Sequence, residues 1–196
     1  IFKDKTVIIT GGSDGVGAAV ARLFAEAGAN LVLAARGKRK LEALAAELRA
    51  KTQVEIFPMD VADAEACAGV FRKAEYEFGR VDILHNNAAS KSDNLEAFFA
   101  PVEDYSLDEW RKIMSVNLDG LFLVAKTVGG QMAASATAAR GVSVSIALAV
   151  TGVEVADDGH LGQPLEGIAA VEDVLLATAQ LHRLTVHEID AWNDHS

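Results

Sequence analysis

Three glycines near the start of the chain have the spacing of a phosphate-binding turn. Gly11, Gly15 and Gly17 lie in the segment TGGSDGVG at residues 10–17. A nucleotide pyrophosphate needs free backbone N–H groups, room for a close approach of the backbone and the positive end of a helix dipole, and such a turn supplies all three. Because the turn stands between a β-branched apolar run and an amphipathic helical pattern, dinucleotide binding is favoured over a merely structural turn.

Polar residues further along the chain could complete such a site. Asp60 follows the third apolar run, and Asn86 and Asn87 follow the fourth, so all three stand at expected strand ends. Taken without the other motifs, the two asparagines are equally well explained as caps of a strand end. Asn117 stands in the middle of a long helical pattern, where its amide competes with backbone hydrogen bonds. This position indicates a function in preference to a chance surface residue.

Other chemistries lack the residues they need. No Gly-Lys-Ser/Thr follows the glycines, which excludes a P-loop phosphotransferase. The five histidines show no metal-ligand spacing and have no Cys/His cluster beside them, so no metal site is expected. His85, at a strand end, is expected to be a hydrogen-bonded polar residue. Cys67, on an apolar helix face, is expected to be a small core residue.

The elements that must position these residues alternate between short β-rich runs and helical patterns, which is typical of βαβ units wound into a parallel sheet. Strands are predicted at residues 6–10, 30–35, 54–57, 81–84, 142–146 and 185–189. Helices are predicted between the first four strands, after the capping box of Ser106 and Glu109, and at residues 171–181. The expected fold is α/β, a Rossmann-type, doubly wound parallel sheet in three layers that forms a single domain over residues 1–196.

Four motifs, in order along residues 6–146, resemble the short-chain dehydrogenase/reductase family. They are TGGSDGVG, Asp60 with Val61, NNAA at 86–89 where the family usually has Asn-Asn-Ala-Gly, and Asn117 within SVNLDG. The resemblance implies a domain that binds NAD or NADP. It places Gly11, Ser13, Asp14, Gly15, Val16 and Gly17 along the pyrophosphate and ribose, Asp60 and Val61 at the adenine, and Asn87, Ala88 and Ala89 beside the cofactor.

The choice of cofactor depends on the end of the second strand. An acidic residue there would bind the ribose 2′-hydroxyl of NAD, and a basic one would meet the 2′-phosphate of NADP. Arg36 follows the strand with Lys38 and Arg39 close behind, which favours NADP and leaves NAD possible. Asp14 argues against NADP, because its charge would repel the phosphate. A solvated loop cation is the other interpretation of Arg36.

The resemblance also implies hydride transfer between nicotinamide and a carbonyl or secondary alcohol. In that reaction Asn117 would be catalytic, holding a water of a proton relay. The family's proton donor is a tyrosine with a lysine four residues on. Tyr76 is followed at that spacing by Arg80, and Tyr105 by Glu109, so neither fits.

The rest of the family's catalytic segment is not found in the chain. Ala147 and Leu148 stand where a serine is expected, and one helix and one strand are lacking after residue 147. Either the natural enzyme contains this segment and the sequence given lacks it, or the chain is a catalytically inactive relative that binds nucleotide. The first is favoured, because without a sixth strand the closing strand at 185–189 would have no neighbour. A start at Ile1 without methionine points the same way.

Composition limits the partners. The 196 residues include 18 basic and 28 acidic ones, and the net charge of −10 repels nucleic acid and anionic membranes. No apolar run approaches the ~18–20 residues of a membrane span, and neither a signal peptide nor a second cysteine is present, so a cytoplasmic protein is expected. A small carbonyl or alcohol substrate, and a homo-oligomer that is a dimer or tetramer, are implied by the resemblance alone.

Overall fold

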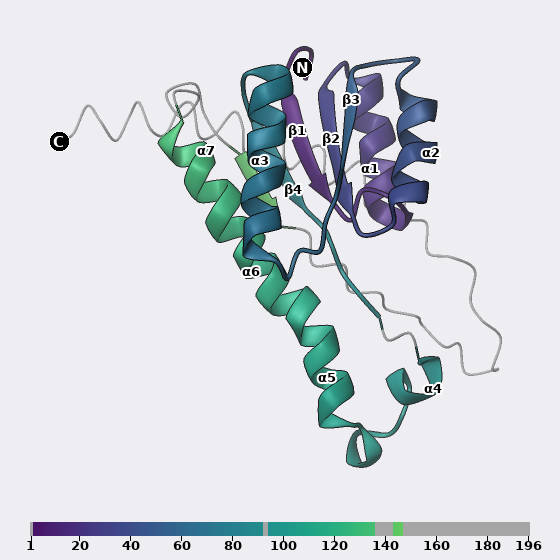
Figure 1. The fold of residues 1–196 in the computed structure, drawn as a ribbon. Helices are drawn as coiled ribbons and strands as arrows, with labels where there is room; N and C mark the ends of the chain where they lie inside the picture. The colour runs from purple at the N-terminus through teal and green to yellow at the C-terminus, as the bar shows by residue number, and fades with distance from the viewer. Residues whose placement is uncertain (1, 92–93, 136–142, 147–196) are drawn as a thin grey trace, which may run out of the picture.

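The computed structural model describes residues 2–91, 94–135 and 143–146, whose strands form a five-stranded parallel sheet (Figure 1). The strands lie in the order β3-β2-β1-β4-β5. Their bounds are Thr6–Thr10 for β1, Asn30–Ala35 for β2, Val54–Pro58 for β3, Ile83–Asn86 for β4 and Ser143–Ile146 for β5. The order confirms the predicted α/β fold, and its reversal between β1 and β4 leaves a place for a ligand at the carboxyl ends of these strands.

The strand β4 begins and ends two residues later than the sequence pattern indicates. The apolar run ends at Leu84, but the pairing continues because His85 and Asn86 lie opposite Ile9 and Thr10 of β1. Both His85 and Asn86 are buried, so polar residues occupy strand positions where a pattern of hydrophobicity expects apolar ones. The prediction of a strand at 81–84 was therefore wrong in its bounds by two residues at each end.

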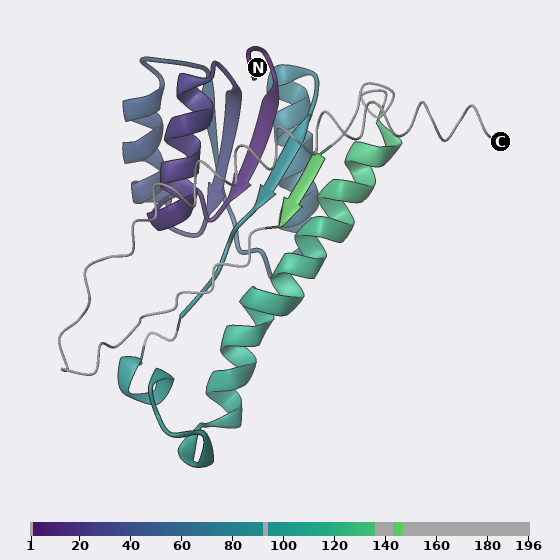
Figure 2. The ribbon, with the colours of Figure 1, turned by 180° about the vertical axis from the view of Figure 1, so that it is seen from behind.

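Helices cover both faces of the sheet, which confirms the three layers (Figure 1, Figure 2). α1 (Gly15–Glu26) and α2 (Lys38–Leu48) lie on one face, and α3 (Ala64–Phe78) lies on the other beside a long helical rod over residues 107–134. The rod consists of α5 (Leu107–Met114), α6 (Leu121–Val124) and α7 (Gly130–Ala134), joined by wider π-helical turns at Ser115–Gly120 and Ala125–Gly129. A short α4 (Leu95–Phe98) and a 3₁₀ turn (Val102–Asp104) precede the rod.

Alternation along the strands divides the core between the two faces. In β1, Val7 and Ile9 belong to the cluster that contains Phe24 of α1, whereas Ile8 belongs to the cluster of α3 and the rod. Cys67 of α3 lies in this second cluster, and burial raises the pKa of its thiol to about 11. Cys67 is therefore the small core residue that was predicted, and its thiol stays protonated at neutral pH.

Some predictions fall on residues outside the described part of the chain. They are the helix at 171–181, the strand at 185–189 and the positions Ala147 and Leu148. The single domain over residues 1–196 accordingly stays a prediction. Of the helices that the structure describes, none combines the length and the hydropathy needed to cross a membrane.

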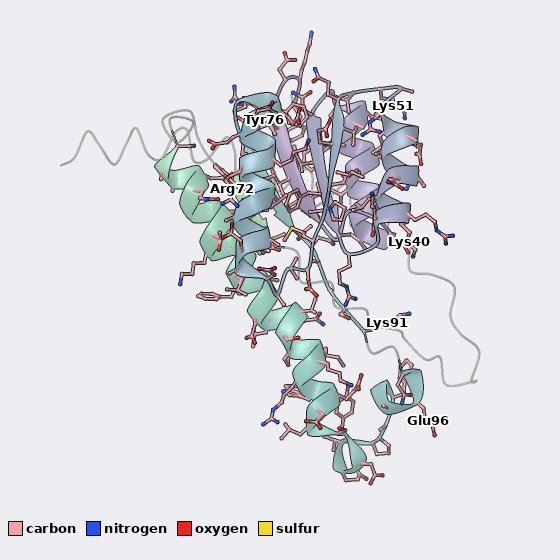
Figure 3. All side chains as sticks on the ribbon, viewed as in Figure 1. Lys40, Lys51, Arg72, Tyr76, Lys91 and Glu96 are labelled. Carbon is pink, nitrogen blue, oxygen red and sulfur yellow. The ribbon has the colours of Figure 1, made fainter. Side chains whose placement is uncertain are left out.

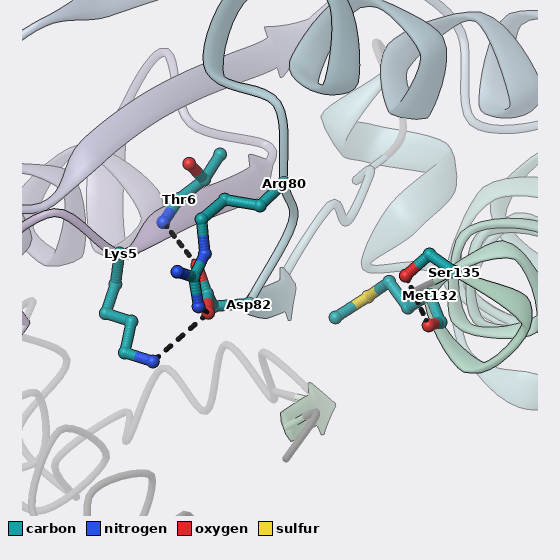
Figure 4. A network of polar contacts seen from close by, with 6 residues as sticks. All are labelled: Lys5, Thr6, Arg80, Asp82, Met132 and Ser135. Carbon is teal, nitrogen blue, oxygen red and sulfur yellow. Dashed lines mark hydrogen bonds and ion pairs between the residues drawn. The ribbon is translucent and has the colours of Figure 1, made fainter. Parts of the chain in front are cut away.

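A buried carboxylate ties the amino ends of β1 and β4 together (Figure 4). Asp82 has no exposed side-chain surface and accepts hydrogen bonds from the backbone N–H of Thr6 at 2.9 Å, from Lys5 Nζ at 3.2 Å and from Arg80 Nε at 2.7 Å. Burial alone would raise the pKa of Asp82, but Arg80, the Thr6 amide and Lys5 outweigh it and hold this pKa below its ordinary value. Asp82 is therefore ionised in the folded protein at neutral pH.

The substitution Asp82→Asn is expected to lower the free energy of unfolding by about 2 kcal/mol at neutral pH, because charge-assisted hydrogen bonds to a buried group are lost. Since the folded pKa of Asp82 is depressed, the contribution of its charge is present above the unfolded pKa and is lost as the pH falls through the folded pKa. Urea unfolding should therefore show that the free energies of unfolding of the variant and the wild type differ less near pH 3 than at neutral pH.

A control for this measurement is Glu26→Gln, which removes an exposed ion pair with Lys51 at 2.8 Å. Exposed pairs of this kind contribute little, so the stability should stay close to that of the wild type at both pH values. A gap for Asp82→Asn that is as wide near pH 3 as at neutral pH would contradict the proposed contribution of the Asp82 charge.

Candidate functional site

The glycine-rich turn connects the end of β1 to the start of α1. Gly11 has φ +67° and Gly15 has φ +51°, left-handed conformations that residues with a side chain rarely adopt. A Cβ atom on Gly11 would lie 2.9 Å from the Cα of Ala88, and one on Gly17 would collide with the carbonyl oxygen of Gly11. A Cβ atom on Gly15 would meet only open space. The turn is therefore closely packed against the end of β4 on one side and open on the other.

Side chains at the carboxyl ends of β1 and β4 hold these strands together behind the turn. Thr10 Oγ1 donates to Asn86 Oδ1 at 3.0 Å and accepts from the backbone N–H of Asn87 at 3.0 Å and of Ala88 at 3.1 Å. Asn87 Nδ2 donates to the Thr10 carbonyl at 3.2 Å, and Asn86 Nδ2 donates to the Leu121 carbonyl of α6 at 2.8 Å. The two asparagines thus join β1, β4 and the rod at one place.

A cleft of about 810 Å³ opens at this edge of the sheet. All the predicted cofactor-binding residues except Gly17 line it, namely Gly11, Ser13, Asp14, Gly15, Val16, Arg36, Asp60, Val61, Asn87, Ala88 and Ala89. The lining residues that were not predicted are Ala35, Gly37, Lys40, Met59 and Val116. Gly17 does not line the cleft, because it is buried in α1 behind the turn. Its lack of a side chain allows the backbone of Gly11 to approach closely.

Asp60 and Val61 form one wall of the cleft, where the chain leaves β3. Asp60 is exposed, and its Oδ1 accepts from the backbone N–H of Ala62 at 3.0 Å. Val61 is buried beside the rod at Gly120, where a Cβ atom would lie 2.7 Å from Val61 Cγ2. This wall places a carboxylate next to an apolar surface, which suits the edge and the face of a purine ring.

Asn117 lies in the π-helical turn of the rod and bonds to the segment that follows β4. Its Oδ1 accepts from the backbone N–H of Ser90 at 2.7 Å, and its Nδ2 donates to the Ser90 carbonyl at 3.0 Å. The neighbouring Val116 and Ala89 line the cleft. The amide of Asn117 therefore fixes one side of the cleft to the rod, and the role of this residue as the holder of a water stays a prediction.

The end of β2 brings cations to the cleft. Arg36 lines it as predicted, whereas Lys38 pairs with Glu42 at 3.7 Å and, like Arg39, is not among the lining residues. The other cation of the cleft is Lys40, which sequence reasoning missed. Figure 3 shows Lys40 at the end of α2 that lies nearest the carboxyl edge of the sheet.

Lys40 forms an ion pair with Asp14, and both residues line the cleft. Its Nζ lies 2.5 Å from Asp14 Oδ2, and the backbone N–H of Gly15 donates to Asp14 Oδ1 at 2.8 Å. The hydrogen bond from Lys40 and the one from Gly15 hold the pKa of Asp14 below its ordinary value. The charge of Asp14, which the sequence presents as unpaired, is thus countered by Lys40.

The remaining candidates for chemistry do not line the cleft. Tyr76 on α3 is 86% exposed, and neither it nor Tyr105 is a lining residue. His85 is buried, and burial lowers its pKa to about 4. The expectation of a hydrogen-bonded His85 was wrong for Nε2, which has no partner among the described residues. In that same part of the chain, no group of three His, Cys, Asp or Glu side chains is arranged to hold a metal ion.

Residues 5–156 match the family model for short chain dehydrogenases. The chain belongs to the short-chain dehydrogenase/reductase family. The matched range contains the glycine turn, the Asp60-Val61 wall, the NNAA segment and Asn117, and so it confirms the resemblance that these motifs carry.

Relatives of this chain include a protein of named activity. D-threitol dehydrogenase of Mycolicibacterium smegmatis is 33% identical over 176 residues, which are 88% of this chain and 64% of that protein. An uncharacterised oxidoreductase of Staphylococcus aureus is 35% identical over 126 residues, which are 64% of this chain and 52% of that protein. The chain thus spans about half to two thirds of the length of these relatives.

Solved structures of the family have the same arrangement of the chain. NAD⁺-bound xylitol dehydrogenase superposes with a TM-score of 0.68 at 27% identity, covering 90% of this chain and 62% of that one. A short chain dehydrogenase from Bacillus anthracis superposes with a TM-score of 0.62 at 33% identity, covering 74% of this chain and 56% of that one. In the first of these proteins the fold carries a nicotinamide dinucleotide.

Proposed function

We propose that this short-chain dehydrogenase binds NAD or NADP in the cleft and, in the complete enzyme, transfers a hydride between nicotinamide and a carbonyl or secondary alcohol. The supporting observation is that the glycine turn, the Asp60-Val61 wall and Asn87 surround one cleft at the carboxyl ends of the strands. Doubly wound folds bind their ligands at this place. Membership of the family supports the class of reaction.

The residues of the cleft fit a dinucleotide. Asn87 lines the cleft, and its buried Oδ1 has no hydrogen-bond partner within the described residues, which leaves an acceptor that a ribose hydroxyl could satisfy. Open space in front of Gly15, at the amino end of α1, leaves room for a pyrophosphate beside backbone N–H groups. Asp60 and Val61 offer a polar edge and an apolar face to adenine.

A bound nicotinamide would supply the hydride donor or acceptor. The chain itself binds and orients: the turn holds the phosphates, Arg36 meets the adenosine ribose and favours NADP over NAD, and Asn87 with Ala88 borders the path toward the reacting end. Asn117 positions Ser90 through its two hydrogen bonds. Its proposed catalytic role is to hold a water that relays a proton during hydride transfer.

A second candidate function is nucleotide binding without catalysis. It is favoured by the two tyrosines of the chain, neither of which lines the cleft or has a lysine four residues on.

Two relatives are named for D-threitol and xylitol, so small polyols are the first substrates to test.

Titration of the complete protein with NADH and NADPH, followed by assays of nicotinamide reduction with D-threitol, xylitol and other secondary alcohols, separates these functions. Dissociation constants of about 1–100 μM, with turnover of at least one alcohol, are expected. Binding without turnover across the alcohols and the matching ketones would overturn the enzyme and favour the second candidate. Absence of binding would overturn both.

Assembly into a homo-oligomer, a dimer or tetramer, is the last part of the proposal. Large apolar side chains are exposed along the rod at Leu107, Trp110, Leu118 and Phe122. Exposed apolar side chains gathered on one element are typical of surfaces that contact other protein segments, which supports subunit contacts through this helix.

A further inference from the structure

Gly120 ends the first π-helical turn of the rod and lies against Val61 of the Asp60-Val61 wall. It is buried and has helical φ −62° and ψ −43°. A Cβ atom on Gly120 would lie 2.7 Å from Val61 Cγ2 and 3.3 Å from Val61 Cβ. Because alanine adopts these helical angles readily, it is the space beside Val61, and not the backbone conformation, that requires glycine here.

Val61 lies between the rod and the cleft. Its side chain is buried in the cluster of α3 and the rod, and it is also one of the residues that line the cleft. Its carbonyl oxygen accepts from Cys67 Sγ at 3.5 Å, and the carbonyl oxygen of Asp60 accepts from the Asp63 N–H at 3.1 Å. These two bonds tie the backbone of the wall to the start of α3. A group that pressed on Val61 from the rod would therefore displace its side chain before its backbone.

The rod is held in place on both sides of Gly120. Three residues before it, the amide of Asn117 bonds to the segment after β4 at 2.7 Å and 3.0 Å. Directly after it, the carbonyl oxygen of Leu121 accepts from Nδ2 of the buried Asn86 at 2.8 Å. Because the rod is tied at these two points, it cannot easily retreat from Val61. A side chain at position 120 would therefore push the Val61 side chain toward the open space of the cleft.

We propose that Gly120 is a positioning residue of the dinucleotide site: its lack of a side chain keeps Val61 against the rod and so keeps open the part of the cleft that receives adenine. The inference rests on the proposed function, which assigns the Asp60-Val61 wall to adenine. To turn a contact of 2.7 Å into an ordinary carbon–carbon separation of about 3.5–4.0 Å, the side chain must shift by about 1 Å. A shift of this size takes up room that a ring in contact with Val61 needs.

Gly120→Ala in the complete protein tests this role. Calorimetric titration with 5′-AMP and fluorescence titration with NADH should show about tenfold weaker binding of both ligands, because the displaced Val61 side chain occupies space that adenine needs. Gly130→Ala is the matched control, since Gly130 lies in the same rod with φ −62° and ψ −41°, and a Cβ atom there would meet nothing within 4 Å. It should change both affinities by less than about twofold.

Val61→Ala tests whether Gly120 acts through Val61, because alanine lacks the Cγ2 atom that stands nearest to position 120. Alone, it should weaken 5′-AMP binding about threefold through the loss of apolar surface. In the Val61→Ala background, Gly120→Ala should change the affinity for 5′-AMP by less than about twofold. A tenfold further loss in this background would overturn the proposal. If Gly120→Ala does not fold alone, the comparison of the double variant with Val61→Ala decides by the same two outcomes.

Hydrogen exchange at the Ser90 amide shows whether the rod moves instead of Val61. This N–H donates to Asn117 Oδ1 at 2.7 Å, so its exchange in Gly120→Ala should stay near the wild-type rate if the rod keeps its place. Exchange that is at least about tenfold faster, or an unchanged affinity for 5′-AMP, would overturn the positioning of Val61 by Gly120 and leave the proposed function standing. A wild type that binds neither 5′-AMP nor NADH nor NADPH would overturn the proposed function itself.

Discussion

Gly17→Ala is expected to weaken dinucleotide binding at least about 100-fold and to lower the free energy of unfolding by about 2 kcal/mol. A Cβ atom at this position would collide with the Gly11 carbonyl oxygen and lie 2.7 Å from Asn87 Nδ2. Neither neighbour can retreat easily, because Gly11 is turn backbone in a left-handed conformation and Asn87 Nδ2 is bonded to the Thr10 carbonyl at 3.2 Å. The turn must therefore move away from β4, and the cleft that it lines must change shape.

The matched control is Gly130→Ala, in the rod and away from the cleft. Gly130 has helical φ −62° and ψ −41°, and a Cβ atom there would meet nothing within 4 Å. Alanine at such a position should raise the free energy of unfolding by about 0.5–1 kcal/mol. Urea unfolding and titration with NADPH measure both effects in both variants. Wild-type affinity in Gly17→Ala would show that the turn does not need this close approach.

The bounds of a strand could be predicted where its apolar run and its pairing with neighbouring strands end at the same residue. β1 and β2 have the predicted bounds because TVIIT and NLVLAA are short, mostly apolar runs with a glycine turn or a cation directly after them. In β4 the apolar run and the pairing end at different residues: Leu84 is the last apolar residue, and the pairing with β1 continues to Asn86. The partners that stabilise the buried Asn86 are Thr10 and Leu121, 76 and 35 residues away, and no local pattern contains them.

The same limit explains which parts of the cleft could be predicted. The turn and the Asp60-Val61 wall are local motifs, so their residues were found. Lys40 was missed because each residue of a helix is rotated by about 100° from the one before, and the exact phase of α2 decides which of its first cations meets Asp14. Asn117 stands between these cases. Its mid-helix position predicted a function, but its partner, the backbone of Ser90, has no signature in the sequence.

Thr10→Val is expected to lower the free energy of unfolding by about 3 kcal/mol and to loosen the carboxyl end of β4. Thr10 is buried, and its hydroxyl serves three groups: it accepts from the N–H of Asn87 and of Ala88 and donates to Asn86 Oδ1. Valine has nearly the same shape but no polar atom, so one substitution leaves two donors and an acceptor without this partner. Buried polar groups without partners cost more than the hydrogen bonds themselves contribute.

Thr10→Ser separates the hydroxyl from the methyl group, because serine keeps the three hydrogen bonds and loses only packing, at a cost of about 1 kcal/mol. Hydrogen exchange of the Asn87 and Ala88 amides should accelerate at least about tenfold in the valine variant and stay near the wild-type rate in the serine variant. A loss of stability that is larger in the serine variant than in the valine variant would assign the effect to the methyl group instead. Because Asn87 and Ala88 line the cleft, the valine variant should also bind NADPH more weakly than the serine variant, which would connect the tie between β1 and β4 to the proposed function.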